Sequence, residues 1–274
     1  MRKVLRSQTA ARLKKLDRES HNAARQPENA DCIHDLRVSI RRLKQELEVF
    51  AEWFEAKRLK TIRRHLRKLM DRCAAVRNCD VAIEVLQAAG CQGPELLARL
   101  EKERRIAGGT LARKLEHWRN AGRIRGWGHH LRVSGAASKE TAEEAARRLL
   151  PPMTEKLFRA GRGASQPNST RLRMHRLRLQ AKGVRYTLEI FDLVYGKKTK
   201  PMLEALKGLQ EKLGAINDCA TTLVMIRRDR GAVAAVRRLA GEREAEFREY
   251  WKKHFGPRQR VRWKALLSMA DGKK

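Results

Sequence analysis

Apolar residues recur at intervals of three and four along most of the chain, a spacing that is typical of amphipathic helices. The segment from His34 to Phe50 is the clearest case, because it contains no proline. Its apolar positions form one stripe, made of Leu36, Ile40, Leu43, Leu47 and Phe50. No segment has the strict alternation of apolar and polar residues that a half-buried strand requires. The sequence therefore predicts an all-α fold.

Prolines, glycines and capping residues place the ends of the predicted helices. We expect helices over residues 4–25, 31–56, 59–86, 94–120, 138–152, 170–191, 201–230, 233–255 and 258–267. Asp31 is the expected N-cap of the second helix, and Thr141 with Glu144 fits a capping box. Pro151 and Pro152 are expected to kink or end their helix. Residues 122–137 are rich in glycine and have no clear period, which predicts a linker.

A row of cationic side chains lies beside the apolar stripe of the His34–Phe50 segment. At 100° per residue, His34, Arg37, Arg41 and Lys44 fall within about 80° of one another. The centre of the apolar stripe lies roughly 120° round from the centre of this row. A row needed only for solubility would lie opposite the core, so this placement favours the wall of a charged cleft.

The same segment recurs at His175–Phe191, where His175, Arg178, Lys182 and Arg185 take the places of the four cationic positions. A second pair of windows, residues 66–86 and 206–226, repeats at almost the same spacing. Chance similarity between two basic amphipathic helices is the alternative explanation. We predict one domain over residues 1–274, built from two four-helix bundle-like halves related by internal duplication and pseudo-two-fold symmetry. The halves cover approximately residues 1–125 and 138–274, with the linker at about 122–137.

Positive charge dominates the composition, with 63 Lys and Arg against 31 Asp and Glu and a net charge of +32. Such an excess repels itself in the folded state and indicates a polyanionic partner. Nucleic acid, an anionic membrane surface and inorganic polyphosphate all qualify. No apolar run approaches the ~18 residues of a membrane span, and no signal peptide is evident. Five cysteines without a CxxC pair favour a reducing compartment, so we expect a cytoplasmic protein.

The residues give little support for metal binding or catalysis. None of the eight histidines forms an HxxxH or HExxH pair, and no GxxxxGK[ST] or GxSxG motif occurs. Asp80 of the first half is replaced by Ala220 in the second. We therefore expect no catalytic residue, no metal and no cofactor. Nucleic acid stays a secondary candidate, because phosphates suit the basic rows while aromatic residues, at 5%, supply no evident base-stacking platform.

Four short motifs resemble those of the CHAD family, the conserved histidine α-helical domain. They are His34-Asp35-Leu36-Arg37-Val38 with Arg41-Arg42-Leu43-Lys44, the stretch from Leu69 to Val81, the stretch from His175 to Glu189, and Leu213 to Asp218. Asn78 departs from the pattern, which has Asp there. The resemblance implies a wholly helical fold of two four-helix halves with a basic central groove. It also implies binding of inorganic polyphosphate and association with polyphosphate granules, without the ExExK motif of a fused triphosphate tunnel domain.

The resemblance carries the following residues of this sequence into the polyphosphate site: His34, Arg37, Arg41, Arg42, Lys44, His175, Arg178, Lys182 and Arg185. Arg63, Arg67 and Lys207 are second-rank candidates from the neighbouring helices, and Arg77 is a weaker one. Both histidines could instead form a hydrogen bond to a neighbouring helix or loop. The expected function is non-catalytic binding of polyphosphate in a basic groove between the halves. An RNA- or DNA-binding protein is the alternative, and a metal-dependent phosphohydrolase is a third possibility.

Overall fold

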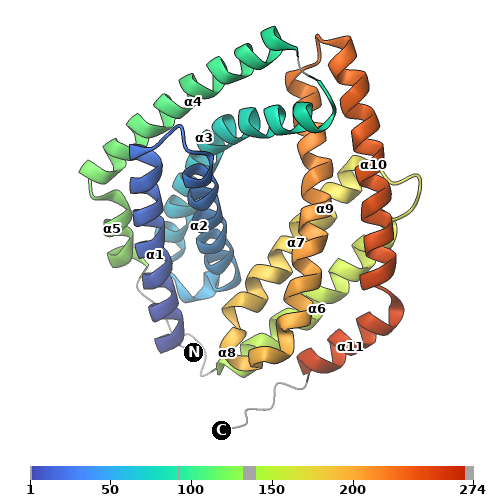
Figure 1. Cartoon of the computed structure of the whole chain (residues 1–274). Helices are drawn as coiled ribbons and strands as arrows, with labels where there is room; N and C mark the ends of the chain where they lie inside the picture. The colour runs from blue at the N-terminus through green and yellow to red at the C-terminus, as the bar shows by residue number, and fades with distance from the viewer. Residues whose placement is uncertain (1, 92, 132–139, 269–274) are drawn as a thin grey trace. The chain divides into compact units, whose positions relative to one another are not determined.

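The computed structural model describes residues 2–91, 93–131 and 140–268, and within these ranges the chain forms helices and no strand (Figure 1). The predicted all-α fold is therefore confirmed. The chain divides into two compact units, Met1–Lys139 and Glu140–Lys274, which are described separately below. In both units, long helices pack on their neighbours in chain order and a shorter helix follows them. The common origin of the two units stays a prediction.

The N-terminal unit contains α1 (Arg2–Arg25), α2 (Ala30–Val49), η1 (Ala51–Trp53), α3 (Ala56–Ala88), α4 (Pro94–Asn120) and α5 (Arg123–His130). Helices α2 and α4 each pack against both α1 and α3, so that the four long helices enclose one core. The predicted apolar stripe of α2 lies in that core, since Leu36, Ile40, Leu43 and Leu47 are fully buried. Burying such a side chain contributes roughly 1.5–3 kcal/mol, so this stripe is a large part of what holds α2 in place.

The first turn of α2 is capped by Asn29, and the prediction of Asp31 as its N-cap is wrong. The Asn29 side chain accepts hydrogen bonds from the backbone amides of Asp31 and Cys32, at 2.9 and 3.3 Å. Asp31 instead lies within the first turn, where a carboxylate favours the positive end of the helix dipole. Two polar residues of similar capping propensity stood close together, and the chain uses the earlier one.

The predicted linker at 122–137 is wrong over its first half, because Arg123–His130 forms α5. Gly122 ends the preceding helix with a φ of 57°, a conformation that glycine adopts without steric cost. Ile124, Trp127 and Leu131 are buried and share one face of the new helix. That face packs on α1, α3 and α4. Residues 132–139 lie outside the described residues.

A carboxylate lies in the core between α1 and α2. Glu46 has no exposed surface, and its Oε1 accepts a hydrogen bond from the Thr9 hydroxyl at 2.6 Å. Its Oε2 lies 2.5 Å from Nε of Arg12 on α1. Burial raises the pKa of Glu46, while Arg12 and the Thr9 hydrogen bond act in the opposite direction. The pair fixes the register of α1 on α2, because either group alone would leave an uncompensated buried charge or a lost partner.

The C-terminal unit contains α6 (Ala142–Ala164), α7 (Arg171–Ile190), α8 (Asp192–Tyr195), η2 (Gly196–Thr199), α9 (Lys200–Met225), α10 (Arg230–His254) and α11 (Pro257–Ser268). The predicted capping box at Thr141 and Glu144 is present. Pro151 and Pro152 do not end α6, which continues to Ala164. Leu150, Leu157 and Phe158 are buried on both sides of the prolines, and this packing outweighs the loss of their backbone hydrogen bonds.

Aromatic rings fill the core of the C-terminal unit where α6, α10 and α11 meet. Phe158, Phe255 and Trp263 pack edge-on or tilted, with ring centroids 5.3–5.8 Å apart, and Trp251 stacks on Phe255 at 4.6 Å. The six-membered ring of Trp251 lies against the backbone of α6 at Gly161. A Cβ at residue 161 would lie 1.7 Å from that ring, so this helix position requires glycine.

Gly161→Ala should destabilise the C-terminal unit by at least about 1–3 kcal/mol, because the rigid, buried indole of Trp251 has to move. Gly163→Ala on the same helix is the matched control, since a Cβ there meets no atom within 4 Å. The control should stabilise by about 0.5–1 kcal/mol through the higher helix propensity of alanine. Urea unfolding followed by circular dichroism measures both. Equal effects of the two substitutions would contradict the described packing.

Candidate functional site

The cationic row of α2 (His34, Arg37, Arg41 and Lys44) lies along the edge of the buried stripe. His34 is exposed in the first turn, while Arg37, Arg41 and Lys44 are half-buried. Arg42 is also half-buried on α2, next to the row. Partial burial matters here, because a guanidinium with its stem held against protein loses less conformational entropy on binding an anion than a fully exposed one. It also lies in a medium that screens charge less than bulk water does.

Cations from two helices surround His34. Burial lowers the pKa of His34, and Arg41, Arg77 and Arg37 lower it further, while Asp35 acts in the opposite direction. Arg77 belongs to α3, so the field at His34 comes from both α2 and α3. Arg37 also acts on Cys73 of α3, since burial raises the pKa of Cys73 to about 12 and the Arg37 charge opposes that rise. The row therefore runs along the contact between α2 and α3.

Two of the lower-ranked candidates on α3 make structural contacts. Arg63 donates a hydrogen bond to the backbone carbonyl of Leu47, near the end of α2, where the last carbonyls of a helix lack intrahelical partners. Arg77 donates two hydrogen bonds to Glu84 on the same helix, at 2.9 and 3.2 Å. Arg67 is exposed on α3. Lys44 of α2 pairs with Glu48 at 3.7 Å, in a contact that is open to solvent.

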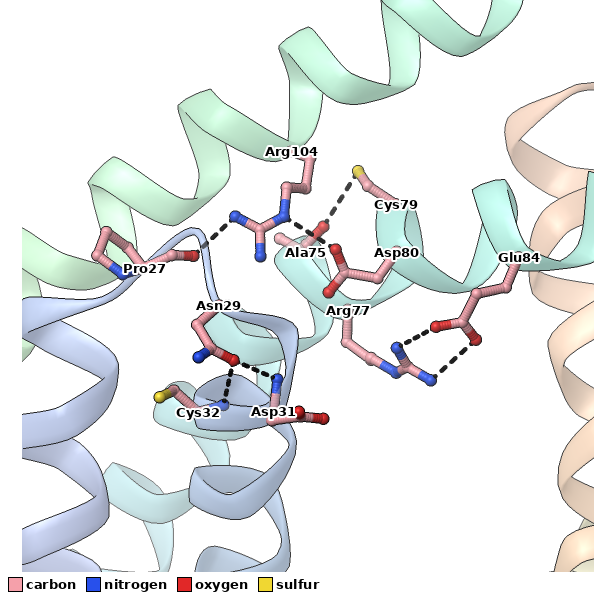
Figure 2. A network of polar contacts seen from close by, with 10 residues as sticks. All are labelled: Pro27, Asn29, Asp31, Cys32, Ala75, Arg77, Cys79, Asp80, Glu84 and Arg104. Atoms are coloured by element: carbon pink, nitrogen blue, oxygen red, sulfur yellow. Dashed lines mark hydrogen bonds and ion pairs between the residues drawn. The ribbon is translucent and has the colours of Figure 1, made fainter.

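A polar network holds the start of α2 against α3 and α4 (Figure 2). Arg104 of α4 donates from Nε to Asp80 of α3 at 2.9 Å, and from another nitrogen to the carbonyl of Pro27 at 2.7 Å. The Asp80 and Arg104 side chains are only 10% and 12% exposed, so their attraction is weakly screened. Pro27 belongs to the α1–α2 loop. Asp80 therefore holds Arg104 in place, and Arg104 holds the loop that leads into the end of α2 that carries His34.

The corresponding row of α7 consists of His175, Arg178, Lys182 and Arg185. His175 is exposed, and its Nδ1 lies 3.3 Å from the side-chain oxygen of Asn217 on α9. For His175, this contact agrees with the alternative role given above for both histidines, a hydrogen bond to a neighbouring helix. Arg178 and Lys182 are half-buried along α7. The structure therefore keeps the order of the row and gives its histidine a neutral partner.

Arg185, at the end of the α7 row, is held by three neighbours. It donates to Glu189 at 3.1 Å and to Gln210 of α9 at 3.0 Å, and its guanidinium lies 5.2 Å from the ring centre of Tyr186. Gln210 in turn donates to the carbonyl of Ala181, so Arg185 ties α7 to α9. Lys207 of α9 is exposed and lies 4.0 Å from Glu211.

The rows therefore combine side chains suited to phosphate with side chains that hold the helices. Arginine binds phosphate oxygens through two parallel hydrogen bonds, and lysine supplies an adaptable point charge. Within the described residues, no three His, Cys, Asp or Glu side chains gather in a way that could hold a metal ion. In the same part of the chain, no helix has the length and apolar composition needed to cross a bilayer.

The sequence reasoning missed the basic and aromatic residues of α5, because it assigned them to a linker. Arg123 donates to Nε2 of His65 on α3 at 3.3 Å and lies over the ring of Trp118. Trp127 packs edge-on against Trp118, with ring centroids 5.8 Å apart. The spacing of Ile124, Trp127 and Leu131 was the available signal, although three glycines from Gly122 to Gly128 obscured it.

The chain is similar in sequence and in fold to proteins that contain a CHAD domain. The sequence model of the CHAD domain matches residues 7–227. The crystal structure of the CHAD domain from the plant Ricinus communis is similar, with a TM-score of 0.71 and 20% identity over 98% of this chain and 92% of that one. PptA from Streptomyces chartreusis has a TM-score of 0.62 and 16% identity, over 91% of this chain and 98% of its own. None of the curated proteins matches the sequence. With well over half of its residues matched by the family's sequence model, the chain belongs to the CHAD domain family.

Proposed function

We propose that this protein binds inorganic polyphosphate, without catalysis, through the cationic rows of α2 and α7. The observation that carries the proposal is the α2 row itself, where Arg37 and Arg41 are half-buried and their charges converge with that of Arg77 on His34. Gathering like charges in this way costs free energy unless an anion neutralises them. A phosphate chain supplies evenly spaced charges that match cations placed one helical turn apart. Membership of the CHAD domain family supports the same ligand.

Within the rows, we assign the phosphate contacts chiefly to Arg37, Arg41, Arg178 and Lys182, because each helix presents its two half-buried cations one turn apart. Arg63 and Arg185 bind groups of neighbouring helices, and Arg77 binds Glu84. We expect these three to add to the positive field while they hold the fold. His34, with its pKa lowered in the unbound protein, is a group whose charge would increase beside a bound polyanion.

Binding of this kind would bring the protein to polyphosphate granules. The interaction is multivalent, so a long chain that contacts several cations at once is held more tightly than the single contacts would suggest. Nucleic acid is the competing ligand, since it also offers phosphates. If RNA displaces long-chain polyphosphate from the protein at equal phosphate concentration, the nucleic-acid alternative is favoured instead.

Changing Arg37 and Arg178 together to alanine should weaken binding of long-chain polyphosphate by about a hundredfold or more, because each of the two charge-assisted contacts contributes roughly 1.5–3 kcal/mol. Isothermal titration with polyphosphate of defined length measures the effect. The matched control is Arg105→Ala with Arg238→Ala, which removes the same charge from exposed positions on α4 and α10. Equal weakening in both double variants would contradict the assignment. Loss of helical circular dichroism only in the first would make Arg37 and Arg178 structural.

The affinity for polyphosphate should rise as the pH falls from 7 toward 5. The pKa of His34 is lowered in the unbound protein, so the ring is mostly neutral at pH 7. A polyanion beside it would raise that pKa, and binding would take up a proton. His34→Gln should therefore flatten the rise, as measured by titrations across this pH range. If the variant keeps the full pH dependence of the wild type, His34 lies outside the field of the ligand.

A further inference from the structure

A cavity of about 590 Å³ opens between the start of α3 and α5, and no residue of the α2 row lines it. Its lining residues all belong to the N-terminal unit, and they include Lys57, Arg58, His65, Arg123, Gly126 and Trp127. Pockets that bind small organic ligands have volumes of about 300–1,000 Å³. The cavity is therefore large enough for a metabolite and larger than a single phosphate ion needs.

One side of the cavity is cationic, and its arginines are paired largely with histidines. Arg58 lies 3.2 Å from Nδ1 of His130, and Arg123 lies 3.3 Å from Nε2 of His65. An imidazole nitrogen accepts from a guanidinium only when it carries no proton, so these contacts leave the arginine charges uncompensated. Burial and then Arg123 lower the pKa of His65, in agreement with a neutral ring.

Carboxylates neutralise little of this charge. Glu55, which also lines the cavity, pairs with Arg58 at 2.7 Å, but both side chains are about half exposed, so the pair is strongly screened. Within the described residues, no ion pair joins Lys57 or Arg123 to a carboxylate. An anion that entered the cavity would meet three cationic side chains and would be a better partner for both arginines than a neutral imidazole.

The lining of the cavity also includes two aromatic ring systems, of which His65 is half-buried and Trp127 is only 4% exposed. Trp127 and His65 have nearly parallel rings, 5° apart in plane with centroids separated by 6.1 Å. Gly126 leaves the backbone of α5 uncovered, and a Cβ at this position would meet no atom within 4 Å. A planar group can therefore lie against the glycine and the edge of the aromatic pair without displacing a side chain.

We propose that this cavity binds a nucleotide, with its phosphates on Lys57, Arg58 and Arg123 and its base against Gly126 and the half-buried ring of His65. A nucleotide combines the two chemistries that the cavity offers, and it uses the volume that a phosphate ion would leave empty. None of the lining residues belongs to the rows of α2 and α7, so the proposal stands or falls independently of polyphosphate binding.

The test is isothermal titration of the full chain with ADP, adenosine and tripolyphosphate. Gly126→Leu should weaken ADP binding by at least about tenfold, because the leucine side chain occupies the place beside Gly126 where the base would lie. Its matched control is Gly241→Leu on α10, where a Cβ likewise meets no atom within 4 Å. The control should bind ADP as the wild type does. Adenosine should bind more weakly than ADP, and so should tripolyphosphate. Both glycine variants should bind long-chain polyphosphate like the wild type.

Should Gly126→Leu fail to fold, Lys57→Gln supplies the second variant, because Lys57 is exposed at the start of α3. Lys57→Gln should weaken the binding of ADP more than the binding of adenosine. The proposal is overturned if the wild type does not bind ADP, or if Gly126→Leu binds it unchanged. It is also overturned if tripolyphosphate binds more tightly than ADP and depends equally on Gly126, since the cavity would then take an inorganic polyanion. The proposal is also overturned if Gly126→Leu loses long-chain polyphosphate binding to the same extent as ADP binding.

Discussion

Repulsion between like charges is the constraint on which the rest of this structure depends. With a net charge of +32, the chain has too few carboxylates to pair with every cation. Two largely buried carboxylates bind between helices, Glu46 with Arg12 and Asp80 with Arg104, whereas the buried Glu19 binds Arg18 within α1. The exposed carboxylates contribute less, because solvent screens them. Cations therefore accumulate along the edge of α2, and in the proposed function an external polyanion relieves that repulsion.

The two units keep similar helical frames while their polar contacts differ. Asp80 of α3 binds Arg104, whereas the aligned residue in α9 is Ala220, and Arg243 of α10 binds the carbonyl of Ala215 and the sulfur of Cys219 instead. His34 lies in the field of Arg77, whereas His175 contacts Asn217. Apolar stripes thus determine how the helices pack, and single polar contacts can change without altering that packing. In both units the cationic row follows the apolar stripe of its helix, so the two rows have the same order along the chain.

Sequence reasoning could predict whatever depends on local periodicity. The buried stripe of α2 and the capping box at Thr141 arise from residues close together in the chain, and both are as expected. It failed at α5, where glycines weakened a helical period that becomes stable only when Trp127 packs on other helices. The contacts of Arg63 and Arg185 were also inaccessible, because they depend on which carbonyl or amide a different helix brings within reach. Periodicity places a side chain on a face but does not give its partner.

In the proposed function, half-buried cations on α2 and α7 bind polyphosphate and release its counterions. The most direct measurement is the salt dependence of affinity for long-chain and short-chain polyphosphate. The slope of log K against log salt concentration approximates the number of phosphate contacts, with about 0.7–0.9 per contact for nucleic acids. We predict a steep slope for the long chain and a shallower slope, with weaker binding, for the short one. Equal affinity and equal slopes for the two lengths would contradict the account.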